Sequence, residues 1–343
     1  MAHIHFQYKT NLERYYKLQP LYFLAIFIGG LTCLLFSAGV LAADWIATKP
    51  IRLIIPYASG GTTDLIGRII STPFAKALGQ SVLVENKGGG GGVIGILAAT
   101  NSQPDGYTIV LPALGAYAAN ETLLQPLPYN STKDLQALTF IGESPLVLVI
   151  SATNTFASLN QLLARSKETG QPITFASGGI GLSAHIAGEL VKIQTKTDMT
   201  HIAYKGGGPA MVDVIGGQVD MLFAPLGSVL PLVQSGKLRA IAIASKERSS
   251  KLSTVPTMQE LGFQNFIMAE SWGLLAPAGL PNDVSRKLRD SMISVIQQPD
   301  VIKRCDEQGV TLKSSTPQQL QDYIQSEIKK YREVIINAKI KVE

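Results

Sequence analysis

Two glycine-rich loops, each placed between an apolar strand and a helix, are the residues of this chain best suited to hold an anion. They cover residues 58–64 (ASGGTTD) and 176–183 (ASGGIGLS). Glycine lets the backbone approach a ligand closely, and the free N–H groups at a helix N-terminus attract negative charge. Two such loops facing each other would form a carboxylate clamp without an arginine. The alternative is that both are tight turns, with Thr63 and Ser183 as ordinary helix caps.

Dinucleotide binding is the first enzymatic alternative. Gly90, Gly92 and Gly95 fit the spacing of a dinucleotide fingerprint after a strand and before a helix. The match lies inside a run of glycines, where it arises easily, and no acidic residue ends a strand about 20 positions later. The pattern does not favour NAD, and we expect no cofactor.

Nucleophilic and metal-assisted catalysis find little support either. Ser183 and His185 are two residues apart, so on one helix they point in different directions. His185 fits a hydrogen bond to a loop better than the role of a general base. Past residue 43 the chain holds two histidines and one cysteine, without a zinc-binding motif. We therefore expect neither a catalytic residue nor a metal site.

Composition indicates a folded chain with a large core. The 343 residues are 46% hydrophobic and 16% charged, which excludes a disordered chain and allows two domains. Without the first 43 residues, 27 basic and 24 acidic residues give a net charge of +3. This small excess predicts no nucleic-acid binding and is compatible with an anionic small ligand.

Residues 1–43 resemble a secretory signal peptide. Three basic residues precede an apolar run from Leu21 to Leu41, which contains glycines and ends in small residues at Ala42 and Ala43. The alternative is an uncleaved membrane anchor, since about 20 apolar residues can span a bilayer. The glycines and the small residues at the end of the apolar run favour cleavage by a signal peptidase, and hence export to the periplasm.

After the leader, apolar runs of strand length alternate with helical patterns. Strands are expected at residues 51–56, 81–84, 107–111, 146–150, 173–176, 201–203, 221–224 and 240–244. Helices are expected from Asp64, at 93–100, 159–168, 183–195, 210–216 and 228–235, and after the caps Asp283 and Thr316. The first helix is expected to turn Leu65, Ile69, Ile70 and Phe74 inward. The alternation predicts an α/β fold with parallel strands.

Eight segments, in order, resemble the tripartite tricarboxylate transporter receptors, also called Bug proteins. They are IRLIIPYASGGTTDLIGRI (51–69), VENKGGGGGVIG (84–95), PDGYT (104–108), FASGGIGLSAHIAGEL (175–190), YKGGGPAMVDVIGGQVDMLF (204–223), GKLRAIA (236–242), VPTMQELG (255–262) and WGLLAPAGLP (272–281). The resemblance spans residues 45–339. It implies a periplasmic solute-binding protein and not an enzyme.

The resemblance also implies a fold and a site. The fold is a two-lobed, Venus-flytrap (type II-like) periplasmic-binding-protein fold with a mixed, mostly parallel sheet in each lobe. Lobe 1 would combine residues 44–145 with 271–343, and lobe 2 would be residues 146–270. The ligand carboxylate would lie between the two lobes. Lys205 stands at the start of a further family-like segment, which would lie near the cleft. The implied ligand-binding residues are Tyr57, Ser59, Gly60, Thr62, Thr63, Asp64, Ser177, Gly179, Ile180, Gly181, Ser183, His185, Tyr204 and Ala224.

Several of these positions depart from the family pattern. Ser59 and Thr62 replace a common Pro and Gly, while Ile180, Leu182 and Ala224 replace residues that are often polar. A less polar site favours a monocarboxylate or an aromatic acid over an amino acid, whose ammonium group needs a carboxylate partner.

The resemblance implies partners as well. We expect a monomer that closes on a small organic acid and presents it to the membrane permease subunits of a tripartite tricarboxylate transporter. Presentation to a membrane sensor kinase is the alternative, because both roles use the closed form.

Overall fold

The computed structural model describes residues 45–341, so the predicted signal peptide lies outside the described residues. Contacts among residues Trp45–Glu343 make them one compact unit. No helix within 45–341 combines the length and apolar character that crossing a bilayer requires.

The first sheet is built from the predicted strand–helix units. Strand β1 pairs in parallel with β2 on one side and β3 on the other, and IRLII is almost entirely buried, as expected for a strand covered on both faces. The elements of this part are β1 (Ile51–Ile55), α2 (Thr62–Leu78), β2 (Val82–Asn86), α3 (Val93–Thr100), β3 (Thr108–Val110) and α4 (Leu114–Leu123).

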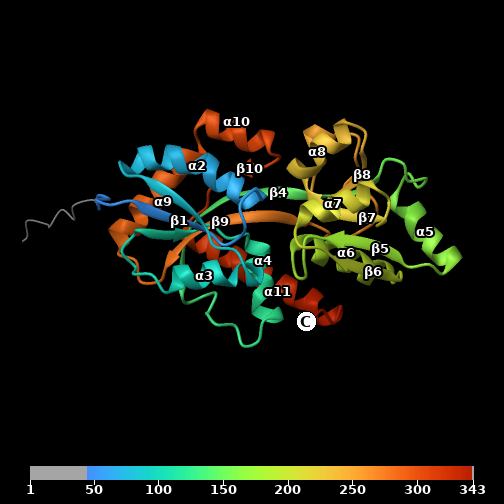
Figure 1. The fold of residues 1–343 in the computed structure, drawn as a ribbon, viewed down its shortest axis with the longest axis horizontal. Helices are drawn as coiled ribbons and strands as arrows, with labels where there is room; N and C mark the ends of the chain where they lie inside the picture. The colour runs from blue at the N-terminus through green and yellow to red at the C-terminus, as the bar shows by residue number, and fades with distance from the viewer. Residues whose placement is uncertain (1–44, 342–343) are drawn as a thin grey trace, which may run out of the picture. The chain divides into compact units, whose positions relative to one another are not determined.

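Two long antiparallel strands connect this sheet to a second one. Strand β4 (Leu135–Ser151) pairs with β9 (Ala269–Pro277) from Leu135 opposite Pro277 to Pro145 opposite Ala269. From residue 146 onward β4 pairs instead with β7 and β8 (Figure 1). The chain thus leaves the first sheet along β4 and returns along β9. The lobe boundaries 44–145, 146–270 and 271–343 stay a prediction, with which this exchange of partners agrees.

The second sheet repeats the parallel units. Strand β5 pairs in parallel with β6 and β7, and antiparallel pairing to β4 completes a mixed sheet. The elements are α5 (Leu159–Thr169), β5 (Ile173–Ser177), α6 (Ser183–Thr195), β6 (Met199–Ala203), α7 (Gly207–Ile215), β7 (Met221–Pro225), α8 (Leu226–Gln234) and β8 (Leu238–Ile243).

The C-terminal segment differs from the prediction in two ways. Helix α9 (Asn282–Ile296) begins after Pro281, so Asp283 is a first-turn carboxylate and makes no side-chain cap. A further helix, α10 (Pro299–Glu307), and a short strand, β10 (Thr311–Leu312), precede α11 (Pro317–Asn337). The predicted capping box of α11, formed by Thr316 and Gln319, is confirmed.

Apolar clusters cover the sheets on both faces. In α2 the inward residues include Ile66, Ile69, Ile70 and Phe74, whereas Leu65 is 37% exposed and was wrongly expected to face inward. Helices α2 and α9 contribute to one cluster with Trp272, and α4 and α11 contribute to another. The loops at the strand ends are therefore held by rigid, buried elements.

A tight contact in the second sheet gives the first prediction. A Cβ atom at Gly188 of α6 would overlap the ring of Phe175, which is 1% exposed. We expect Gly188→Ala to lower the free energy of unfolding by about 1–3 kcal/mol through overpacking. Urea unfolding measures the change. Gly208→Ala in α7, where nothing lies within 4 Å of the added carbon, is the control; equal effects of both changes would contradict the packing argument.

Candidate functional site

The first candidate loop joins β1 to α2 and leaves the start of that helix open. Gly61 precedes α2 and makes no side-chain cap, so the first-turn N–H groups remain available to a ligand. Ser59 and Gly60 are exposed and Thr62 is half-buried. Gly60 has a φ of 87°, a conformation that favours glycine.

Asp64 holds this loop from inside. Its carboxylate, only 4% exposed, accepts hydrogen bonds from Gly60 N (2.9 Å), Arg68 Nε (3.0 Å) and Asn86 Nδ2 (3.0 Å). Burial acts to raise the pKa of Asp64, but these hydrogen bonds together hold it below its usual value. Asp64 therefore anchors the loop, and its predicted contact with a ligand stays a prediction.

Tyr57 and Thr63 connect the loop to a helix start and a strand that are distant in the sequence. The Tyr57 hydroxyl accepts from Ala113 N (3.2 Å) and donates to Ala113 O (3.3 Å), just before α4. Thr63, 4% exposed, accepts from Trp272 Nε1 of β9 at 2.9 Å. Both side chains position the loop against buried elements.

The second candidate loop joins β5 to α6. Ser177 is fully buried; its hydroxyl lies 2.6 Å from His201 Nε2, donates to Gly179 O and accepts from Gly179 N. Gly179 and Gly181 have positive φ angles of 153° and 79°. Ile180 is 37% exposed, and α6 begins without a side-chain cap. As in the first loop, the backbone and one exposed side chain remain accessible.

A stacked histidine pair supports the second loop. His185, 3% exposed, accepts from Gly181 N through Nδ1 at 3.0 Å, as predicted for a histidine that hydrogen-bonds a loop. Its ring lies 3.6 Å from that of His201 at an interplanar angle of 10°. His185 therefore supports the loop, and its predicted contact with a ligand stays a prediction. His201 is not among the residues predicted from the sequence, because it lies on β6, outside both glycine-rich loops.

The start of α4 brings the two loops together. Ser183 accepts a hydrogen bond from Tyr331 of α11 at 3.0 Å. A Cβ atom at Gly115 would collide with the Tyr331 hydroxyl and lie 2.7 Å from Ser183 Oγ. Ala113 is hydrogen-bonded to Tyr57, and Gly115 packs closely against Ser183. The segment 113–115 therefore links the first loop to the second. Sequence analysis did not find this segment.

The remaining predicted residues lie at the ends of β6 and β7, the two strands that flank β5, and Tyr204 N donates a hydrogen bond to Ser177 O at 2.9 Å. Tyr204 donates to Asp213 Oδ2 at 2.6 Å, which raises the pKa of Tyr204 to about 12, while Lys205 is exposed. Ala224, 5% exposed and opposite Val147, packs inside an apolar cluster. Ala224 thus contributes to the core of the second sheet.

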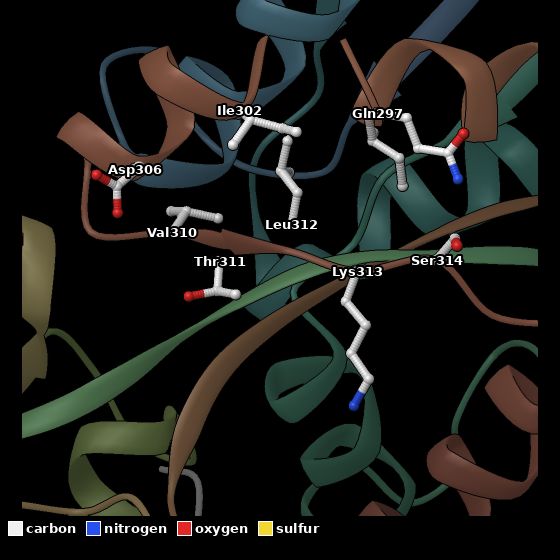
Figure 2. Close-up of a pocket in the computed structure, with 9 residues that line it drawn as sticks. Gln297, Ile302, Asp306, Val310, Thr311, Leu312, Lys313 and Ser314 are labelled. Carbon is white, nitrogen blue, oxygen red and sulfur yellow. The ribbon is translucent and has the colours of Figure 1, made fainter. Parts of the chain in front are cut away.

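A separate pocket of about 400 Å³ lies between α10 and β10. Figure 2 shows Ile302 and Leu312 pointing into it and Lys313 pointing away. It shares no residue with either loop. Within residues 45–341, no group of three or more His, Cys, Asp or Glu side chains is placed to hold a metal ion.

The histidine pair makes stability depend on pH. Burial, with a contribution from His185, lowers the pKa of His201 from 6.5 to about 3. Between pH 6.5 and pH 3 the unfolded chain binds a proton that the folded protein does not. The free energy of unfolding therefore decreases as the pH is lowered from 6.5, by up to about 1.4 kcal/mol per pH unit. We expect His201→Gln to remove this contribution, so that the free energy of unfolding, measured with urea between pH 7 and 5, depends on pH less steeply by the equivalent of up to one proton. An unchanged slope would exclude the imidazole as its source.

Comparison with known proteins places this geometry in a family. Residues 66–340 match the family model described as "Tripartite tricarboxylate transporter family receptor". Protein BugT of Bordetella pertussis is 35% identical over 303 residues, which is 87% of this chain and 93% of BugT.

Solved structures extend the similarity. MatC of Rhodopseudomonas palustris with bound malate is 28% identical, with a TM-score of 0.76 over 84% of this chain and 100% of that one. R. palustris Rpa4515 with adipate is 26% identical, with a TM-score of 0.80 over 87% and 99%. These neighbours share the predicted two-lobed fold. The chain belongs to the tripartite tricarboxylate transporter receptor family, whose members are periplasmic solute-binding proteins.

Proposed function

We propose that this chain captures a small organic acid between its two glycine-rich loops and delivers it to the permease subunits of a tripartite tricarboxylate-type transporter. One observation carries the proposal: two helices, α2 and α6, begin without a side-chain cap at loops linked through residues 113–115. Free N–H groups at helix starts favour an anion. Relatives with bound malate and adipate support a carboxylate.

The groups that remain accessible in the two loops limit the chemical class of the ligand. Asp64, Ser177 and His185 are engaged within the loops, which leaves the backbone N–H groups, Ser59 and Ile180 to contact it. Ala224 is buried, so the apolar character of the site depends on Ile180 and the half-buried Leu182. We propose that these contact the carbon chain or ring of an organic acid.

Thermal denaturation with added ligands tests the proposal. The ligands are malate, adipate, benzoate, aspartate and a sugar as control. A ligand that binds only the folded protein at a hundredfold excess over its Kd adds about 2.7 kcal/mol of stability. We expect a rise in Tm with at least one organic acid and none with the sugar. Tight binding of aspartate would contradict the apolar ligand class, and no rise with any acid would contradict carboxylate capture.

A negative charge introduced at the first loop tests whether the ligand binds there. Ser59 is exposed beside the start of α2. We expect Ser59→Glu to weaken binding of the acid that gives the largest shift by about tenfold or more, because like charges repel at short range. Titration calorimetry measures Kd, and Ser59→Gln is the control of equal size. Equal Kd values for both variants would place the ligand elsewhere.

A further inference from the structure

Glu270 is a carboxyl group that neither the loops nor the fold employs. It is the second residue of β9, half-buried, and lies within the ladder that pairs β9 with β4, next to the terminal pair of Pro145 and Ala269. Burial is the one influence on its pKa, which rises to about 7. Neither a hydrogen bond nor an ion pair from residues 45–341 compensates for that burial. A carboxyl group in this state costs stability unless a ligand uses it.

A second unsatisfied group lies directly beside it. Ser144 of β4 is opposite Glu270 in the antiparallel register, so the two side chains share one face with Cβ atoms about 5 Å apart. Ser144 is 0% exposed, and its hydroxyl has no hydrogen-bond partner among the described residues. Two neighbouring polar groups are thus left unpaired on the strands that join the sheets.

The same face of β9 is turned toward the candidate site. Trp272 lies two residues after Glu270 and therefore on the same side of the strand; it reaches Thr63 at the start of α2. Burial is the main cause of the raised pKa of the Tyr57 and Tyr331 hydroxyls, and the charge of Glu270 adds a smaller contribution to both. These hydroxyls bond Ala113 and Ser183 respectively. Glu270 therefore lies among residues that hold both loops.

No lysine or arginine among residues 45–341 forms an ion pair with Glu270. One cation on each of the neighbouring helices α2 and α11 is paired with a carboxylate of its own helix. Arg68 of α2 is paired with Asp64, and Lys330 of α11 with Glu327. The titratable groups on which the charge of Glu270 acts are Tyr57 before α2 and Tyr331 of α11. Glu143 of β4 is the residue before Ser144 and therefore points to the opposite face, where it acts on Tyr323 of α11. Strand β3 carries no ionisable side chain, and α3 carries none.

A carboxylate ligand at this place would meet Glu270, and two ionised carboxylates in contact repel strongly. We propose that Glu270 in its neutral form, with the Ser144 hydroxyl beside it, donates a hydrogen bond to the ligand carboxylate, so that binding takes up one proton from solvent. The inference rests on the proposed function and adds a ligand contact on the connecting strands. Two carboxyl groups that share one proton are an established arrangement in other proteins.

Binding as a function of pH tests the proposal. For adipate, whose carboxyl groups are ionised above pH 6, we expect Kd to rise about 30-fold between pH 6 and 8.5, since only the protonated form binds. Glu270→Gln keeps the donor without the charge, so its Kd should equal the pH 6 value across this range. In wild-type protein at pH 8, calorimetry in two buffers of different ionisation enthalpy should show uptake of about one proton.

Controls separate this proposal from its alternatives. Glu143→Gln makes the same change on the opposite face and should keep the wild-type pH profile. If 6-aminohexanoate binds more tightly as pH rises, and Glu270→Gln abolishes that binding, Glu270 is a cation site and the proposal is overturned. A pH-independent Kd for adipate also overturns it. If malate, adipate and benzoate all fail to bind at every pH, the proposed function itself fails.

Discussion

The backbone ladder between β4 and β9 is the interaction on which the rest of the structure depends. Both strands continue from the first sheet toward the second, and β4 exchanges β9 for β7 and β8 after Pro145. Each sheet positions one glycine-rich loop, so the geometry of the pair of loops is set by two strands that belong to neither loop. The unpaired groups of Ser144 and Glu270 lie on this ladder, close to the exchange of partners.

Both loops follow one design with different residues. A polar side chain bonds backwards to the loop backbone: Asp64 to Gly60 in the first loop, and His185 to Gly181 in the second. In each case the side chain lies four residues after the glycine, within the first turn or two of the helix. The internal bonds fix the loop before any ligand arrives, which reduces the ordering that binding requires. The ligand is then left mainly with backbone donors.

Local patterns were sufficient for much of the fold. Helices α3, α5 and α6 match their predicted ranges within one residue: α5 and α6 combine clear boundaries with an apolar face, and α3 is bounded by a glycine run and a polar turn. Helix α4 was missed, since seven of its ten residues are buried and LGAYAANETL shows no polar face. The full length of β4 and the presence of β9 depend on their pairing with each other. The loops were found from their glycines, but the inward bonding of Asp64 and His185 and the proximity of Glu270 arise only from contacts in space.

The hydrogen bond from Trp272 to Thr63 has an optical consequence. The chain contains two tryptophans; Trp45 contacts Tyr107 near the beginning of the described chain, whereas Trp272 is fully buried and bonded to the first turn of α2. Indole emission responds to the polarity and hydrogen bonding around the ring nitrogen. The protein therefore carries an intrinsic fluorophore bonded to the first turn of α2, so a change in that hydrogen bond would alter its emission spectrum without any added label.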